Sequence, residues 1–136
     1  MSRWYAEYKS ADLVSAPPPT NVGGYGELLN HFHARGHLLP QTEEGLAAID
    51  DLINSAVDID LLAELARPIG MFYGDVLTHT IPGAYWEVIK DGYPRVRVTR
   101  TFAVDVVRVA NRRLAIADPT LVQNYAYVLG IVRHDA

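Results

Sequence analysis

Four side chains near the middle of the chain combine the residue types needed for proton transfer. Tyr73, Asp75, His79 and Tyr85 follow one another closely, and His79 comes four residues after Asp75. His79 falls between an expected helix and an expected hairpin, where a general base could face a cleft. One hypothesis is therefore a small enzyme with a cleft around these residues. The other is that His79 binds a backbone carbonyl at a helix end, which lone histidines do more often.

The usual nucleophile and cofactor motifs are missing. The chain has no cysteine, which excludes thiol catalysis, disulfides and cysteine metal ligands. Its serines lack the elbow motif of serine hydrolases. The glycines Gly23, Gly24 and Gly26 follow prolines rather than a strand, so they lack the context of a dinucleotide site. We expect no cofactor.

Three histidines close together raise the question of a metal site. On a helix, Glu27 and His31 share one face, whereas His33 and His37 share another roughly 200° away. Imidazole and carboxylate are ordinary zinc ligands, but convergence of all four would require the helix to break. We therefore expect surface histidines and no metal.

Charge is divided along the chain. Seven acids and no base lie between Gln41 and Ala66, and seven bases against three acids lie between Tyr85 and Leu114. Two solvated surfaces that partly neutralise each other would explain this, and so would a dipolar surface that orients a charged protein partner. The net charge of −4 argues against nucleic-acid binding. The predicted partner-binding residues are Glu43, Glu44, Asp50, Asp51, Tyr85, Tyr93, Arg95 and Arg97.

The arginines and tyrosines of this set belong to an expected β-hairpin, formed by residues 84–89 and 93–99. A two-residue turn at Asp91-Gly92 would mix charged and apolar side chains on both faces. A three-residue loop segregates them, because a shift by one residue moves every side chain to the other face. We therefore predict the register that pairs Trp86 with Val96 and Glu87 with Arg95. Pro94 marks either an edge strand or a position where no ladder donor is needed.

The helix expected before the hairpin carries a stripe of small residues, Ala66, Gly70, Gly74 and Thr78. Such a stripe lets another element approach the helix backbone, and we expect the Trp86 face of the hairpin to pack there. Charged residues interrupt the apolar run, so the stripe does not indicate a membrane helix. Pro68 should kink or restart the helix.

The whole pattern predicts an α+β fold that is mostly helical, with one small antiparallel sheet built on the Trp86 hairpin. We expect a proline-rich arm over residues 1–20 and a single domain over residues 21–136. The N-terminus has no apolar signal region, so we expect a cytoplasmic protein. Further helices are expected over 21–35, after Thr42, from Asp58 or Asp60, over 102–114, where a strand is the alternative, and after Asp118-Pro119.

The helix and hairpin motifs resemble small uncharacterised single-domain α+β families of bacteria. The residues concerned are Gly70, Gly74, Trp86, Val88, Gly92, Pro94 and Val96. The arginine-rich composition also suggests a bacterial source. Such families include immunity-type and partner-binding proteins, so the resemblance implies interaction rather than catalysis. We therefore favour a protein-binding module, an inhibitor or immunity-type protein, whose partner has a basic surface. The small enzyme and a homo-oligomer remain alternatives.

Overall fold

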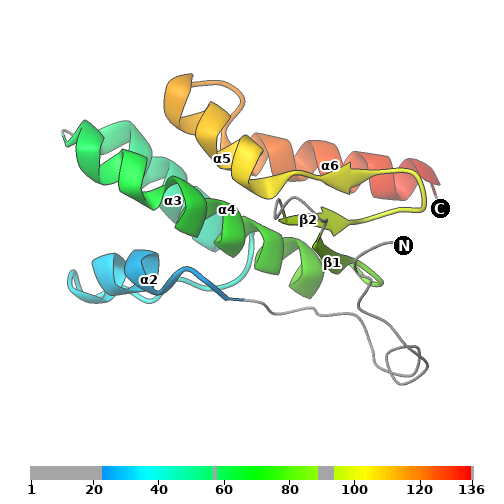
Figure 1. The fold of residues 1–136 in the computed structure, drawn as a ribbon, viewed down its shortest axis with the longest axis horizontal. Helices are drawn as coiled ribbons and strands as arrows, with labels where there is room; N and C mark the ends of the chain where they lie inside the picture. Colours follow the sequence, from blue (N-terminus) through cyan, green and yellow to red (C-terminus); the bar gives the residue numbers. More distant parts are fainter. Residues whose placement is uncertain (1–22, 57, 89–93, 136) are drawn as a thin grey trace.

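The computed structural model describes residues 23–56, 58–88 and 94–135, which form five helices and one small sheet (Figure 1). The helices are α2 (Gly26–His33), α3 (Glu43–Ser55), α4 (Ile59–Thr80), α5 (Val106–Ala115) and α6 (Leu121–Asp135). The strands β1 (Tyr85–Val88), β2 (Pro94–Arg97) and β3 (Ala103–Val104) are antiparallel and lie in the order β1-β2-β3. The predicted α+β class is confirmed. The predicted N-terminal arm lies outside the described residues.

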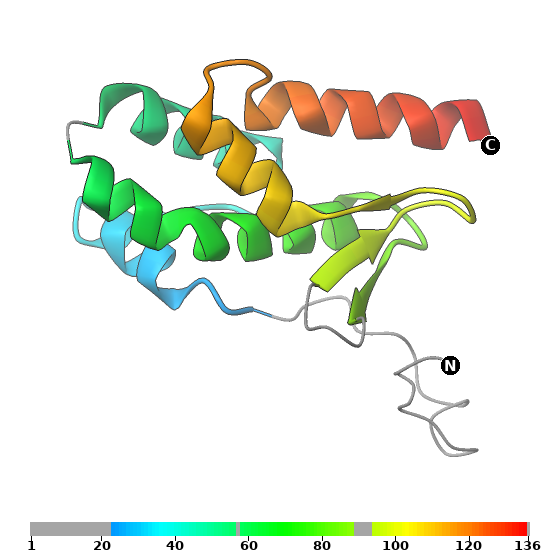
Figure 2. The same cartoon turned by 45° about the horizontal axis from the view of Figure 1, so that its top comes forward.

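Helix α4 lies at the centre, with α2 on one side and α5 on the other, while α3 packs against α6 (Figure 2). It begins after Asp58, whose carboxylate accepts a hydrogen bond from the Leu61 amide at 3.1 Å, and continues without interruption through Pro68. The predicted restart at Pro68 is wrong, so two expected helices are one. Proline removes a single helix hydrogen bond, and the buried packing on both sides of Pro68 outweighs that loss. None of the described helices is long and apolar enough to cross a membrane.

The small residues of α4 allow two other elements to contact its backbone. A methyl group added at Gly74 would lie 2.1 Å from Cη2 of Trp86, and one at Gly70 would lie 2.7 Å from the Cα atom of Val107. Trp86 is only 2% exposed. The prediction that the Trp86 face of the hairpin packs on the glycine stripe is therefore confirmed, and the same stripe also receives the start of α5.

Strands β1 and β2 pair in the predicted register, with Trp86 opposite Val96 and Glu87 opposite Arg95. The turn that joins them lies outside the described residues. Of the two alternatives for Pro94, the edge strand is wrong, because β2 is the central strand. Strand β3 pairs with only two residues at the other end of β2, so Pro94 lies beyond that ladder. Its missing amide therefore costs no hydrogen bond to β3.

The other expected helices are present with shifted boundaries. Helix α2 is shorter than the predicted range 21–35. The range 102–114 contains both of the structures considered for it, because the short strand β3 leads directly into α5. Asp105 separates the two elements, and its carboxylate accepts a hydrogen bond from the Arg108 amide at 3.1 Å. This cap ends the strand and begins the helix.

Candidate functional site

Within the described part of the chain, the predicted catalytic residues lie in different surroundings. Asp75 is fully buried, and its carboxylate accepts hydrogen bonds from the Trp86 indole at 2.8 Å, from the Gly23 amide at 3.2 Å and from Tyr25. His79 is exposed near the end of α4. Its Nδ1 atom lies 2.9 Å from the Asp75 backbone carbonyl, not from the carboxylate. The carboxylate therefore ties the Trp86 hairpin and the segment before α2 to α4.

The two tyrosines predicted for that cleft also lie in different places. Tyr85 is half-buried on β1, whereas Tyr73 is buried on α4 and its hydroxyl donates to Oδ1 of Asn124 on α6. Burial raises the pKa of Tyr73 well above its ordinary value. Burial is the main reason that the pKa of Tyr25 is raised to about 12, and the hydrogen bond to Asp75 adds to the effect. Both hydroxyls therefore remain protonated at neutral pH, as hydrogen-bond donors inside the fold.

Asp50, which we expected on an acidic surface, is in the interior and only 6% exposed. Its Oδ1 atom accepts hydrogen bonds at 2.9 Å from Nε of Arg113 and from the Leu121 amide, and Oδ2 accepts one from the Val122 amide at 3.1 Å. The same arginine donates to Asn54, one turn further along α3, at 2.8 Å. Asp50 therefore joins the end of α5 to the start of α6. The predicted exposure of this acid is wrong.

The other acids of this stretch are exposed on α3, at the start of α4 or just before it. We call Glu43, Glu44, Asp51, Asp58, Asp60 and Glu64 the acidic set. Between described residues, no member of the set forms an ion pair. These six carboxylates therefore leave a negative charge on the surface around α3 and the start of α4.

Both arginines of the hairpin bind the same acid, Glu87, on the neighbouring strand β1. Glu87 accepts hydrogen bonds from Nε of Arg95 at 2.9 Å and from Nε and Nη2 of Arg97, each at 3.2 Å. The sequence predicted the Glu87–Arg95 pair but not the second arginine. A partner anion would have to compete with Glu87 for both. Tyr93, the other residue predicted for this surface, lies outside the described residues.

The histidines are distributed without convergence. Within the described residues, no group of three or more histidines and acids could hold a metal ion. His33 and His37 are exposed. His31 is half-buried, and its Nε2 atom has no hydrogen-bond partner among the described residues.

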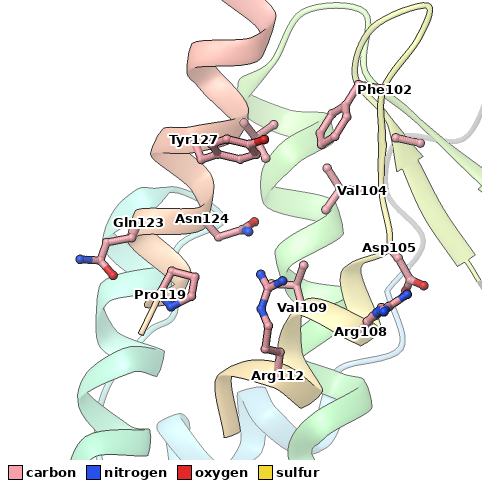
Figure 3. A pocket seen from close by; sticks show the side chains of 12 residues that line it. Phe102, Val104, Asp105, Arg108, Val109, Arg112, Pro119, Gln123, Asn124 and Tyr127 are labelled. Carbon is pink, nitrogen blue, oxygen red and sulfur yellow. Dashed lines mark hydrogen bonds between the residues drawn. The ribbon is translucent and has the colours of Figure 1, made fainter. Parts of the chain in front are cut away.

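A groove between α5 and α6, which the sequence reasoning missed, has a volume of about 580 Å³ (Figure 3). We call it the α5–α6 groove. It is lined by Phe102, Ala103, Val104, Asp105, Arg108, Val109, Arg112, Pro119, Gln123, Asn124, Tyr127 and Val128. Figure 3 shows Phe102 and Tyr127 on opposite sides of one end of the groove, while Arg112 extends from α5 towards its middle. Tyr127 is 64% exposed.

Buried contacts hold both walls of the groove in place. Helix α5 rests on Gly70 of α4 and is joined to the start of α6 through Asp50. Helix α6 is held on α4 by the hydrogen bond between Tyr73 and Asn124 and by a second one, at 2.8 Å, from Tyr125 to Thr80. The groove is therefore a preformed feature of the fold.

The charge of the groove is positive. Arg108 and Arg112 are exposed and four residues apart, so they share one face of α5. Neither makes an ion pair with a described residue. Asp105 is the only acid among the lining residues, and its carboxylate already caps α5. The groove therefore presents two cations and the exposed Tyr127 beside apolar side chains.

Two signals for the groove were present in the sequence. Arg108 and Arg112 belong to the basic stretch and share a face of a predicted helix, and Tyr127 lies off the apolar stripe of the last helix. The sequence could not show that these helices pack side by side. That depends on contacts such as Asp50 to Leu121, which join residues 71 positions apart.

Among known families and structures, the chain matches one family profile. The sequence profile of the family of unknown function DUF6278 matches residues 23–130. The match therefore includes all the residues that line the α5–α6 groove. No curated protein and no solved structure matches the chain.

Proposed function

We propose that this chain, which belongs to the DUF6278 family, is a cytoplasmic protein-binding module without catalytic activity. It would act by stoichiometric association with a partner protein, as an inhibitor or immunity protein does. We propose the α5–α6 groove as its main contact surface, in place of the hairpin surface.

The observation that carries this proposal is the composition of the groove. It combines Arg108, Arg112 and an exposed Tyr127 with an apolar lining. Arginine and tyrosine are enriched among the residues that dominate binding energy at protein interfaces. Large exposed aromatic side chains on a preformed surface bind at low entropic cost, because few torsions must be fixed.

The form of the groove favours a protein over a small metabolite. Sites for small molecules enclose most of the ligand surface. In this groove both arginines, Pro119, Gln123 and Tyr127 are exposed, so one side is open to solvent. An open surface with an apolar floor suits a segment of a larger partner, because the rest of the partner covers the exposed side.

The acidic set has a secondary role in the proposal. Its exposed carboxylates would attract a partner with a basic surface over a distance and so raise the association rate. Asp50 has no such role, because it is buried. Arg95 and Arg97 contribute less than the sequence suggested, because Glu87 already binds both.

A photo-crosslinking experiment tests the proposal. Tyr127 is replaced by a photoreactive phenylalanine analogue in the native host, and Ala126, exposed on the same helix but outside the groove, receives the same analogue as a control. We expect one protein to be crosslinked through position 127 and not through position 126. The purified pair should then form a complex of one partner per chain.

Three results would contradict the proposal. The first is equal crosslinking from both positions, and the second is no crosslinking from position 127. The third is turnover of a metabolite that His79→Ala abolishes while the melting temperature is unchanged, because the chain would then be the small enzyme of the alternative hypothesis.

A further inference from the structure

We infer that the α5–α6 groove binds an acidic segment of the partner that also carries an aromatic or large aliphatic anchor. The inference rests on the proposed function, since it names the chemistry of the segment that the same groove receives. The acidic set suggested a basic partner surface; the groove requires a locally acidic segment.

Charge complementarity supports the acidic part of the segment. Arg108 and Arg112 are both exposed in the groove and form no ion pair with a described residue. A guanidinium binds a carboxylate through two parallel hydrogen bonds. Side chains four apart on a helix are about 5–6 Å apart at Cβ, so neighbouring carboxylates of one segment can reach both arginines.

The other end of the groove supports the anchor. Phe102 and Tyr127 lie on opposite sides of it, and Val104 lies beside Phe102 (Figure 3). An apolar side chain placed between the two rings would bury their exposed surfaces as well as its own. Burial of a large apolar side chain favours binding because its surface is removed from water. The groove therefore combines an apolar end, which suits a bulky apolar side chain, with arginines that suit carboxylates.

The charge of the whole chain argues against nucleic acid as the ligand. Nucleic-acid affinity comes mainly from many contacts between cations and phosphates. The groove offers two exposed arginines, whereas the chain has a net charge of −4. A peptide segment with a few carboxylates carries less negative charge than a nucleic acid does. The net negative charge of the chain therefore repels it less.

The inference can be tested with a library of random peptides displayed on phage and selected on the purified full chain. Counter-selection uses the double variant Arg108→Glu/Arg112→Glu, so that peptides bound elsewhere are removed. We expect enriched peptides to contain two or more acidic residues near one aromatic or large aliphatic residue. A fluorescent copy of the best peptide is then titrated by anisotropy.

The control for these titrations is the double variant Arg67→Glu/Arg133→Glu, which makes the same change in net charge at exposed arginines outside the groove. We expect the groove variant to weaken binding at least tenfold, since like charges at a contact cost about 1.4 kcal/mol or more. The control should change binding less than about threefold, because salt screens charges more than about 8 Å away. Tyr127→Ala should also weaken binding, and unchanged melting temperatures would show that each variant is folded.

Several outcomes would overturn the inference. These are enriched peptides without acidic residues, equal weakening by both double variants, and displacement of the peptide by inorganic phosphate or by a DNA oligonucleotide at lower concentration than by unlabelled peptide. Failure of the proposed function is distinguished by the crosslinking experiment. A partner captured through position 127 whose contacting segment is not acidic would retain the proposed function and reject this inference.

Discussion

At the scale of the residue, Asp50 shows how a charged side chain can organise a fold instead of facing solvent. Its two oxygens accept from Arg113 and from the first amides of α6, at 2.9 to 3.1 Å. A carboxylate at a helix N-terminus is favoured by the helix dipole and by the unpaired amides. Removing one partner of a buried ion pair leaves the other charge uncompensated. Asp50 should therefore be among the residues that matter most for stability.

We predict that Asp50→Ala lowers the free energy of unfolding by about 3–5 kcal/mol, because Arg113 and the start of α6 lose their acceptor. The neighbouring Asp51 is exposed, so Asp51→Ala should change the free energy of unfolding by no more than about 0.5 kcal/mol. Urea denaturation of the two variants measures both effects. Similar values for both would show that the buried pair does not stabilise the fold.

A second prediction at this scale concerns alkaline pH. The pKa of Tyr25 is 10.0 in the unfolded reference and about 12 in the folded chain. Between these values the unfolded state holds fewer protons than the folded state, so the free energy of unfolding falls as pH rises. The burial of Tyr73 acts in the same direction.

Tyr25→Phe should therefore make this fall less steep, and it should cost about 1 kcal/mol below pH 10 through the lost hydrogen bonds. Denaturant titrations at a series of pH values, with tyrosinate absorbance recorded in parallel, check both effects. An identical slope in the variant and the original chain would contradict the assignment.

At the scale of the element, α4 organises the fold through the absence of side chains at two positions. Trp86 occupies the space above Gly74, and the backbone at Val107 occupies the space above Gly70. The first contact positions the sheet on α4, and the second positions α5. One wall of the groove therefore depends on these two glycines. Glycine is unfavourable within a helix by roughly 0.5–1 kcal/mol relative to alanine. The close contacts it permits offset that cost.

We predict that Gly74→Ala destabilises the fold by about 1–3 kcal/mol, because the added methyl group overlaps a buried ring. Gly130, in α6, has nothing within 4 Å of an added methyl group. Gly130→Ala should therefore stabilise by about 0.5–1 kcal/mol, as alanine does in an exposed helix. Thermal and urea denaturation give both values.

Combining Gly74→Ala with Trp86→Ala provides a further check. Trp86→Ala alone should cost about 3–5 kcal/mol. The double variant should cost less than the sum of the single variants, since the overlap disappears with the ring. An additive result would show that the two residues are not in contact.

At the scale of the whole molecule, the acidic set and the groove arginines lie on different elements. The acidic set lies on α3 and around the start of α4, whereas the groove arginines lie on α5. A difference in charge between two surfaces can orient an approaching charged partner. In the proposed function, this attraction would act mainly before contact, whereas the groove would act after it.

We predict that Glu43→Lys/Glu44→Lys slows association with the partner by up to about tenfold at low salt and leaves dissociation almost unchanged. High salt should remove the difference. Stopped-flow or surface-based kinetics at several salt concentrations measure it. Binding of the isolated groove peptide is the control, because the acidic set lies outside the groove. A change confined to the dissociation rate would contradict the steering role.

The sequence by itself determined the local structure. The alternation of Trp86, Val96 and their neighbours specified the hairpin register, because a shift by one residue would bury charge. The spacing of Gly70 and Gly74 indicated a helix face built for close contact. The class of fold followed from the number and type of such elements. These inferences succeeded because they depend on residues near one another in the chain.

Only the tertiary structure decided which charges are buried and which side chains meet. Asp50 and Asp51 are indistinguishable by composition, yet one binds Arg113 inside the fold and the other faces solvent. Pro68 reads as a helix breaker, but buried packing keeps α4 continuous. The α5–α6 groove exists because elements distant in sequence hold two helices side by side. Local patterns carry the identity and sign of a charge, whereas its burial and its neighbours depend on the packing of the whole chain.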